Sequence, residues 1–493
     1  MTISPTGSTV QGKGLSAGDL GLVGSVSVGL SSTAPVYSLA ATLGFIVLAV
    51  GVQAPAALIV AFVPMLLIAY AYRELNRDTP DCGTTFTWAS RAFGKFAGWM
   101  GGWALALSGI VVLANLAQVA GQYLWRLVDP ELGDNVPLVT TTGVAFIAAM
   151  TWTNYRGVDI SEKMQRTLIA LQYAALALFT GFAVYRISAG QAFDFTPLSL
   201  AWFNPFAVES LSAFTYAILL ALFIYWGWDT CLALNEETSN PRKTPGRAAL
   251  ISSVILLATY VGVSVVVMMF AGTGSEGLGL GNEDNAADVF YSVSEAVMGD
   301  WAWVAVLAVL ISAASSTQTT ILPTARGTLS MAAHRALPER FATIHAKYLT
   351  PTFSTVLMGV VASAYYVVMT LVSEDFLADS IASLGLFIAF YYGLTGFACT
   401  WYFRRTLRSS TRNLMFRGVL PLLGALMMTA AFILSALDML DPEYGSTVFL
   451  GVGGTFIIAV GAMLLGVALM VLWYATAQRR LAADEAIAEY TAD

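Results

Sequence analysis

Charged side chains are scarce in this chain. They make up 11% of the 493 residues, whereas water-soluble proteins carry about 25%, and 57% of the residues are hydrophobic. Long apolar runs recur from residue 20 to residue 475, with short polar gaps between them. This composition does not provide a water-soluble surface, and it excludes nucleic-acid binding as a main activity. It indicates a polytopic membrane protein whose main partner is the lipid bilayer.

Cysteine and histidine are also rare. The three cysteines, Cys82, Cys231 and Cys399, are scattered and form no Cys-x-x-Cys pair, which argues against a disulfide scaffold and a zinc site. The sequence has two histidines and contains no HExxH, GxSxG, Walker or paired-carboxylate motif. It therefore predicts no enzyme, no ATP-driven pump and no cofactor. Any driving force for transport would come from ion or substrate gradients.

Twelve apolar stretches are long enough to cross a bilayer, which takes about 20 residues of helix. They cover residues 19–43, 50–72, 98–127, 136–153, 167–187, 211–235, 248–271, 301–324, 353–372, 380–403, 417–437 and 447–475. Of the 24 Lys and Arg residues, 22 fall in the termini and in alternate loops on one side, and only Arg126 and Arg186 fall on the other. Because basic loops stay in the cytoplasm, we expect a multi-pass protein of the cytoplasmic (inner) membrane with both termini cytoplasmic.

The first span contains residues that disfavour a continuous helix. Residues 21–35 include three glycines, five hydroxyl side chains and Pro35. Proline cannot donate a backbone hydrogen bond and glycine tolerates an unwound backbone, so we expect an interruption near residues 29–33 that lines a cavity or a ligand. The candidate substrate-binding residues here are Ser27, Gly29, Ser31, Ser32 and Thr33. The alternative is a continuous helix whose small residues pack closely against a neighbour.

The sixth span has a similar feature, where Gly227 lies among large aromatic residues and precedes Asp229. Asp229 is the only acid placed deep within a span, and burying it costs at least about 2.5–3.5 kcal/mol, so it is a functional candidate by default. We expect a second interruption here, with Tyr225, Gly227, Trp228 and Asp229 at the substrate. The alternatives are that Asp229 only caps the second half of the helix and that Trp228 gates the pocket.

Two interrupted helices five spans apart are typical of an inverted repeat of five plus five helices, which holds its substrate between half-helix ends at mid-membrane. The predicted fold is therefore an all-α integral membrane protein with twelve transmembrane helices, of which the last two lie outside the repeat. The predicted divisions are an N-terminal cytoplasmic tail (1–18), the first repeat (19–187), the second, inverted repeat (211–403), the last two helices (417–475) and a C-terminal cytoplasmic tail (476–493).

Four ordered segments carry a more specific signal. They are Tyr72-Arg73-Glu74-Leu75 followed by Pro80, Gly83, Thr84, Phe86, Trp88, Gly94, Gly98 and Trp99; Asn154-Tyr155-Arg156-Gly157-Val158; Glu236-Glu237-Thr238-Ser239-Asn240-Pro241-Arg242-Lys243-Thr244-Pro245; and Arg326 with Leu337-Pro338, Phe341, His345, Thr350 and Pro351. Together they resemble the amino acid–polyamine–organocation (APC) family of transporters over nearly the whole chain. The resemblance implies a LeuT-like fold and a permease that works by alternating access.

Two details of the resemblance concern the substrate. Many amino acid carriers of that family have Gly-x-Gly in the first break, where backbone amides hold the substrate carboxylate, but residues 27–31 keep only Gly29. The hydroxyls of residues 31–33 could substitute, since each donates one hydrogen bond. The string Gly227-Trp228-Asp229 is similar to the Gly-Phe-Asp of members that carry cationic amino acids. An indole face with a carboxylate suits an ammonium group.

The eighth span is rich in hydroxyl side chains that could bind a coupling ion. The pairs Ser315/Thr319 and Ser316/Thr320 each share a helix face, and one pair could bind sodium together with carbonyls of the first span. The alternative is that these hydroxyls bond their own backbone or join neighbouring helices. A proton carried by a carboxylate such as Asp229 is the other coupling ion that stays open.

The sequence as a whole predicts a secondary active transporter that moves an amino acid, with a cationic one favoured by Asp229, across the cytoplasmic membrane. Asn115 and Gln118 in the third span and Tyr391 and Tyr392 in the tenth complete the candidate pocket residues. The alternatives are a transporter of polyamines or other organic amines and, from another class, a substrate sensor that does not transport. The sequence predicts no particular oligomeric state.

Overall fold

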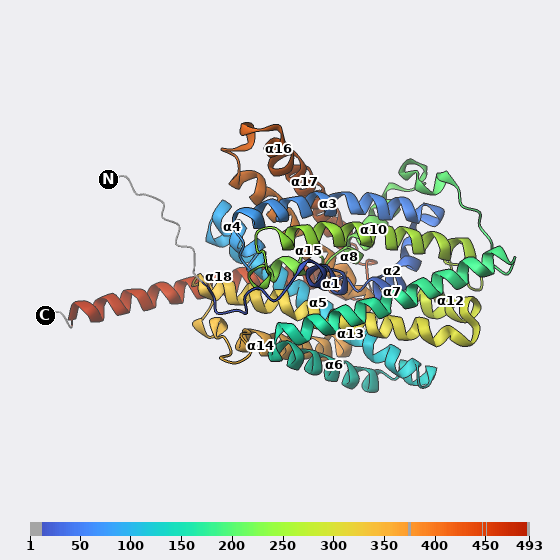
Figure 1. Cartoon of the computed structure of the whole chain (residues 1–493), viewed down its shortest axis with the longest axis horizontal. Coiled ribbons are helices and arrows are strands. Elements are labelled where there is room, and N and C mark those ends of the chain that lie inside the picture. Colours follow the sequence, from blue (N-terminus) through green and yellow to red (C-terminus); the bar gives the residue numbers. More distant parts are fainter. Residues whose placement is uncertain (1–11, 373–375, 446, 450, 491–493) are drawn as a thin grey trace.

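The computed structural model describes residues 12–372, 376–445, 447–449 and 451–490, and these form a bundle of long helices that run side by side (Figure 1). The helices that position the site are α1 (Leu22–Ser32), α2 (Pro35–Val50), α3 (Ala54–Asp78), α5 (Lys95–Arg126), α7 (Val158–Ser188), α8 (Leu211–Ile224), α9 (Thr230–Ala233), α10 (Thr244–Ala271), α13 (Ala302–Ala333) and α15 (Phe376–Tyr402). The others are α4 (Thr85–Phe93), α6 (Val136–Arg156), α11 (Glu283–Ala286), α12 (Val289–Met298), α14 (Thr352–Val372), α16 (Thr411–Asn413), α17 (Leu420–Asp438) and α18 (Gly454–Tyr490).

The length and composition of the helices make the chain a multi-pass membrane protein. Ten helical stretches among the described residues are long and apolar enough to cross a bilayer, and α8 is a shorter apolar helix. The first stretch, Leu22–Asp78, joins two of the predicted spans because α1, α2 and α3 follow one another with only short interruptions. The predicted sixth span falls below the required length because its helix ends at Ile224.

Burial separates central helices from peripheral ones. In α5, 78% of the most apolar window is buried within the protein, against 17% in α6 and 22% in the Gly454–Thr476 part of α18. The α13 helix is also central, and its hydroxyl-rich segment from residue 315 to residue 320 is fully buried. Small side chains in this segment allow neighbouring helices to approach closely. The helices α6 and α18 therefore lie at the periphery of the bundle, whereas α5 and α13 form its centre.

The last predicted span begins later than expected. Residues 447–453 were predicted to be helical, but Val448–Phe449 (β1) and Val452–Gly453 (β2) form a short antiparallel hairpin. Gly451 in the turn has a positive φ of 79°, which glycine adopts without strain. The helix α18 starts only after this hairpin, at Gly454.

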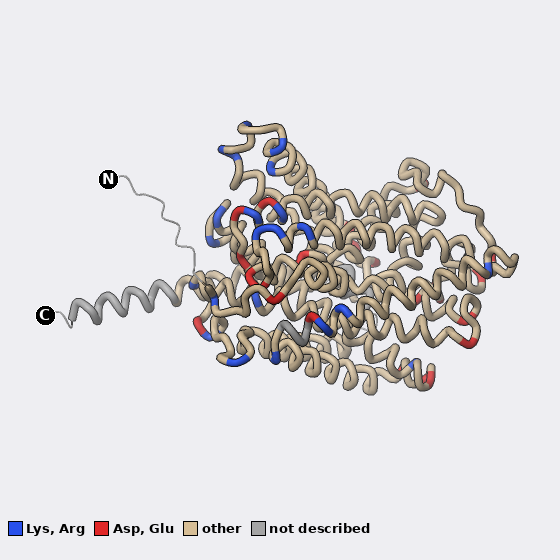
Figure 2. The backbone as a smooth tube through the Cα atoms, viewed as in Figure 1, with Lys and Arg blue, Asp and Glu red and all other residues tan. Residues whose placement is uncertain are grey.

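The two ends of the bundle differ in charge (Figure 2). Lys and Arg residues gather at the end where α5 and α10 begin and α13 finishes, whereas the opposite end carries mainly Asp and Glu. We call these the basic end, at which α13 finishes, and the acidic end, at which α13 begins. The figure agrees with the partition of basic residues that the sequence predicts.

Candidate substrate site

The first span is interrupted between α1 and α2. Ser32 is the last residue of α1, Ala34 adopts a left-handed conformation with φ 45°, and Pro35 is the first residue of α2. Proline at this position begins a helix because its missing N–H is not needed there. The Ser38 hydroxyl donates to the carbonyl of Thr33 at 2.7 Å and so satisfies a backbone group exposed by the break. The interruption therefore lies at residues 33–34, at the late edge of the predicted 29–33.

Two of the candidate residues in the first span lie away from this break. Ser27 and Gly29 are buried within helical α1. A side chain at Gly29 would place its Cβ 2.8 Å from the Ser252 hydroxyl of α10, so this glycine lets two helices pack closely. For Gly29 the geometry favours the packing alternative over an unwound backbone, because α1 remains helical until Ser32.

The sixth span is interrupted over residues 225–229, as the sequence predicts. The helix α8 ends at Ile224 and α9 begins at Thr230. Gly227 has φ 113°, and a Cβ on this residue would lie 2.7 Å from the carbonyl oxygen of Ser32. Glycine is required here for both reasons, because the backbone of the first break passes directly against it.

A hydroxyl pair joins the two interruptions. The Ser32 and Thr230 hydroxyl oxygens are 2.7 Å apart, and both side chains are buried. On the other side of the break, the Ser316 hydroxyl of α13 donates to the Ser32 carbonyl at 2.9 Å. The breaks of the first and sixth spans therefore meet at one point against α13. Thr230 was missed by the sequence interpretation, although a hydroxyl directly after the buried acid was a usable signal.

Asp229 lies at this meeting point and faces polar partners from α15. Its carboxylate accepts hydrogen bonds from the hydroxyls of Tyr392 at 2.9 Å and Tyr391 at 3.3 Å, and the residue is 5% exposed. It occupies the N-cap position of α9, but its side chain makes no capping hydrogen bond there among the described residues. The two phenols satisfy the carboxylate instead, so the capping alternative does not account for this acid.

Aromatic rings enclose the same region. Trp228 stacks on Tyr392 with ring centroids 5.4 Å apart, and Tyr72 of α3 meets both rings edge to face. Trp226 donates its indole N–H to the hydroxyl of Tyr391. Tyr392 was among the pocket residues that the sequence suggests, whereas Tyr72 was not. Tyr72 did stand out in the sequence, but only as the start of a loop segment.

Several buried polar atoms in this part of the protein lack a hydrogen-bond partner among the described residues. Among the candidates they are the hydroxyls of Ser31, Tyr225 and Thr320, the indole N–H of Trp228 and the side-chain carbonyl of Asn115. Unpaired buried polar atoms are costly, and a ligand or water that bonds them removes that cost. Ser31 differs in this respect from Thr33, whose hydroxyl donates to the carbonyl of Leu30 in its own helix.

The hydroxyls of α13 divide between two faces, as their spacing predicts. The Ser315 hydroxyl donates to the Gln165 side chain of α7 at 2.5 Å, and Thr319 donates to carbonyls of its own helix. These two residues follow the alternative in which hydroxyls join helices and bond their own backbone. Ser316 instead reaches the first break, and Thr320 one turn later has an unpaired hydroxyl.

A multi-pass bundle in which two interrupted helices meet around a buried carboxylate defines a class of protein, the membrane transporters. The family follows from comparison with known proteins. The family model described as "Amino acid permease" matches residues 20–468, so the chain belongs to the amino acid permease family, as the resemblance implied. Its members are transporters rather than enzymes.

Three relatives illustrate the similarity. The large neutral amino acids transporter small subunit 2 of Oryctolagus cuniculus is 27% identical over 309 residues, which cover 60% of this chain. The matched region spans 55% of that relative, so the chain spans about half of its length. An uncharacterized transporter of Mycobacterium tuberculosis is 27% identical over 70% of this chain and 72% of its own length. The human Asc-type amino acid transporter 1 is 24% identical over 64% of this chain and 60% of its own length.

Proposed function

We propose that this protein is a secondary transporter that moves an amino acid across the cytoplasmic membrane by alternating access. The observation that carries the proposal is the Asp229 carboxylate, which lies buried at the meeting point of two interrupted helices. A buried acid in a membrane protein marks a ligand, ion or proton site. The names of the relatives, which include large neutral amino acid and Asc-type transporters, add support for amino acid substrates.

The proposal includes the five-plus-five architecture. The pair α1 and α2 in residues 19–187 corresponds to the pair α8 and α9 in residues 211–403, and residues 417–475 supply two extra helices. The first apolar stretch contains two spans, because α2 and α3 belong to different ones, and α8 with α9 forms a further span. The ten apolar stretches therefore correspond to twelve spans. The basic end then faces the cytoplasm, together with the tails 1–18 and 476–493, because basic residues resist translocation.

The substrate ammonium group belongs at Asp229 in this proposal. The carboxylate provides the opposite charge, and the rings of Trp228 and Tyr392 beside it provide a surface that attracts cations. The end of α8 adds to this attraction, because the C-terminal end of a helix carries a partial negative charge. An α-ammonium and a side-chain ammonium would both be accepted by this chemistry.

The substrate carboxylate belongs on the other side of the first break. The helix α2 begins at the break, and its first N–H groups carry the positive end of the helix dipole. The unpaired Ser31 hydroxyl is the additional donor available there, since Ser32 is bonded to Thr230 and Thr33 to its own helix. This arrangement favours an amino acid over a polyamine, which has no carboxylate to place at α2.

A thermal-shift screen on purified protein tests the substrate class. A ligand that binds only the folded state raises the melting temperature in proportion to the logarithm of its concentration over its Kd. We expect stabilisation by one group of amino acids, with arginine, lysine, leucine, phenylalanine and serine as the panel. Putrescine tests the organic-amine alternative. Stabilisation by putrescine with no response to any amino acid would contradict the proposal and favour that alternative.

The coupling ion in this proposal is sodium at Ser316 and Thr320. Ser316 already touches a carbonyl of the first break, and the unpaired Thr320 hydroxyl lies on the same face of α13. We expect uptake at fixed pH to fall when external sodium is replaced by choline. A proton gradient or plain exchange is the explanation if uptake stays unchanged in choline, and the sodium proposal then fails.

A further inference from the structure

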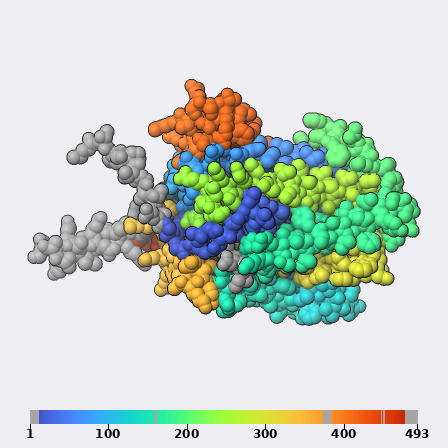
Figure 3. All heavy atoms as spheres, in the orientation of Figure 1, coloured from blue at the N-terminus to red at the C-terminus, as the bar shows by residue number. Residues whose placement is uncertain are grey.

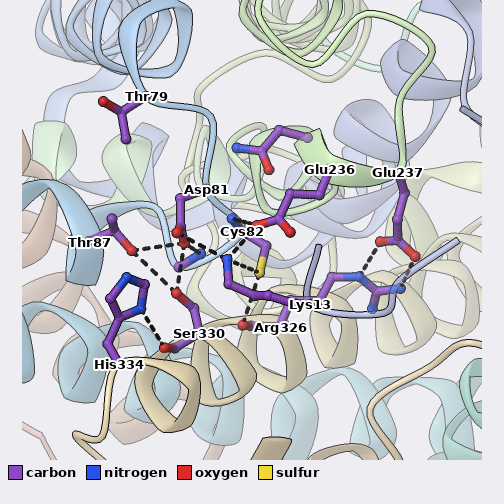
Figure 4. A network of polar contacts seen from close by, with 12 residues as sticks. Lys13, Thr79, Asp81, Cys82, Thr87, Glu236, Glu237, Arg326, Ser330 and His334 are labelled. Carbon is purple, nitrogen blue, oxygen red and sulfur yellow. Dashed lines mark hydrogen bonds and ion pairs between the residues drawn. The ribbon is translucent and has the colours of Figure 1, made fainter. Parts of the chain in front are cut away.

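A lysine from the N-terminal segment is buried at the basic end of the bundle (Figure 4). The Lys13 ammonium lies 3.0 Å from a carboxylate oxygen of Asp81 and 2.5 Å from one of Glu236, and its side chain is 3% exposed. Burial acts to lower the pKa of Lys13, but the acidic groups around it, which include Asp81 and Glu236, outweigh burial and hold the pKa above its ordinary value. Lys13 is therefore a charged group that two acids retain inside the protein.

The two acids belong to different parts of the chain. Asp81 lies in the connection between α3 and α4. Its other carboxylate oxygen accepts hydrogen bonds from the Gly83 backbone N–H, from the Thr87 hydroxyl and from the hydroxyl of Ser330, which belongs to α13. Glu236 lies just after α9, at the exit of the sixth span, and also accepts from the Cys82 backbone N–H at 2.9 Å. Through these contacts Lys13 ties the N-terminal segment to the sixth span, the α3–α4 connection and α13 at once.

The segment has a second anchor at its other end. The Leu20 N–H donates to the carbonyl of Glu237, and the Ser239 N–H donates to the carbonyl of Leu20. Between the anchors at residues 13 and 20, the chain lies on the outside of the basic half of the molecule, where the space-filling view shows it in dark blue (Figure 3). We call residues 12–20, which are anchored by Lys13 and Leu20, the strap.

A buried ion pair lies beside the strap. Arg326 of α13 forms two hydrogen bonds with Glu237, and both side chains are almost fully buried. Glu237 is also the residue whose carbonyl accepts from Leu20. The strap therefore runs beside a layer of charged contacts that links the sixth span to α13, and α1 begins two residues after it, at Leu22.

We propose that the strap is a latch that holds the basic end of the transporter closed, with Lys13 as the residue that must be released before this end opens. The inference rests on the proposed alternating access, in which α1 and the sixth span separate from α13 when substrate leaves. The contact between Lys13 and Asp81 crosses that boundary, because Asp81 is bonded to Ser330 of α13. Glu236 follows the sixth span and holds Lys13 on the moving side. Release leaves the buried Asp81 carboxylate without its cation, so the open state is disfavoured until the latch returns.

Cys82 provides a direct readout of the latch. Its sulfur lies 3.6 Å from the Lys13 ammonium nitrogen and is fully buried beneath it. Burial raises the pKa of this thiol well above its ordinary value, although the Lys13 ammonium acts to lower it, and buried neutral thiols react slowly. Loss of the Lys13 charge alone would therefore slow labelling, so faster labelling reports exposure of Cys82. Cys231 and Cys399 are buried within the helices and report whether the rest of the protein stays folded.

The experiment measures N-ethylmaleimide labelling of each cysteine by peptide mass spectrometry, on the full-length protein in proteoliposomes without substrate. Lys13→Gln removes the charge and keeps a polar side chain of similar length. We expect it to speed Cys82 labelling on the order of tenfold or more, because breaking a buried ion pair costs more than the equivalent of a tenfold change. Lys13→Arg keeps the charge and should label slowly, as should Lys347→Gln, which changes an exposed lysine at the same end.

Three outcomes are informative. Faster labelling of Cys82 alone in Lys13→Gln, repeated in Glu236→Gln and not additive in the double variant, supports the latch. Equal labelling of Cys82 in the wild type and in both single variants overturns it. If Cys399 is labelled together with Cys82, the protein has unfolded, Lys13 is a stabilising residue rather than a latch, and the proposal fails. None of these results depends on a substrate, so a failure of the latch is distinguishable from a failure of the transport proposal.

Discussion

The Asp229 carboxylate is held by two phenols rather than by a cation. Hydrogen bonds from neutral donors stabilise the buried carboxylate without neutralising it, so its negative charge stays available to a ligand. Two charges about 4 Å apart at an effective dielectric of about 20 attract by about 4 kcal/mol before the cost of desolvation. A substrate ammonium group therefore binds more tightly because of Asp229, even if desolvation offsets most of the attraction.

The charge of Asp229 is tested by Asp229→Asn. Asparagine keeps the size and can still accept a phenol hydrogen bond, so we expect the protein to fold and insert. We expect the affinity for amine-bearing substrates to fall at least about tenfold, equivalent to about 1.4 kcal/mol. Isothermal titration with the substrate found by thermal shift measures the change, and Asp300→Asn, an exposed acid at the acidic end, is the matched control. Unchanged affinity in Asp229→Asn would mean that the carboxylate has a structural role.

Only part of the site could be predicted from the sequence at the residue scale. Asp229 was identifiable because a lone acid in an apolar span is costly, and Gly227 because it interrupts a run of aromatics. Tyr391 and Tyr392 were identifiable as pocket candidates but not as the partners of Asp229, because they lie more than 160 residues away and the sequence does not say which face of α15 they occupy. Gly29 was expected at the first break but lies within α1. In a sequence, a glycine that lets two helices pack closely looks the same as one that allows a helix to unwind.

At the scale of elements, the two interruptions fit together through backbone contact. Gly227 brings the sixth span against the Ser32 carbonyl, and no larger residue fits the space or the positive φ. The predicted spans were accurate for most helices because lipid requires long apolar segments with internal backbone hydrogen bonds. The short hairpin at residues 448–453 escaped this reasoning, because its apolar residues read equally well as the start of a helix.

Gly227→Ala tests this fit between the two elements. The methyl group would meet the Ser32 carbonyl and the φ of 113° would become strained, which together cost about 2 kcal/mol or more. We expect a lower melting temperature in detergent and loss of substrate-induced stabilisation. Gly262→Ala is the control, because a Cβ at this position in α10 has no neighbouring atom within 4 Å. Equal behaviour of the two variants would contradict the proposed contact between the breaks.

At the scale of the whole molecule, charge sets the orientation. The gathering of Lys and Arg at one end predicts that this end stays in the cytoplasm. The connection after α15 carries Arg404, Arg405 and Arg408, all of them exposed. We expect trypsin to cleave this connection in inside-out membrane vesicles and to leave it intact in sealed right-side-out vesicles. Cleavage from the outside alone would reverse the orientation.

Transport itself is the central claim, and uptake into proteoliposomes tests it most directly. Purified protein is reconstituted, and entry of the radiolabelled amino acid that gives the largest thermal shift is followed over time, with protein-free liposomes and Asp229→Asn alongside. The account predicts saturable uptake that depends on an imposed ion or substrate gradient and is lost or strongly weakened in Asp229→Asn. Binding of the amino acid without any uptake above that of protein-free liposomes would contradict it and would make this protein a sensor rather than a transporter.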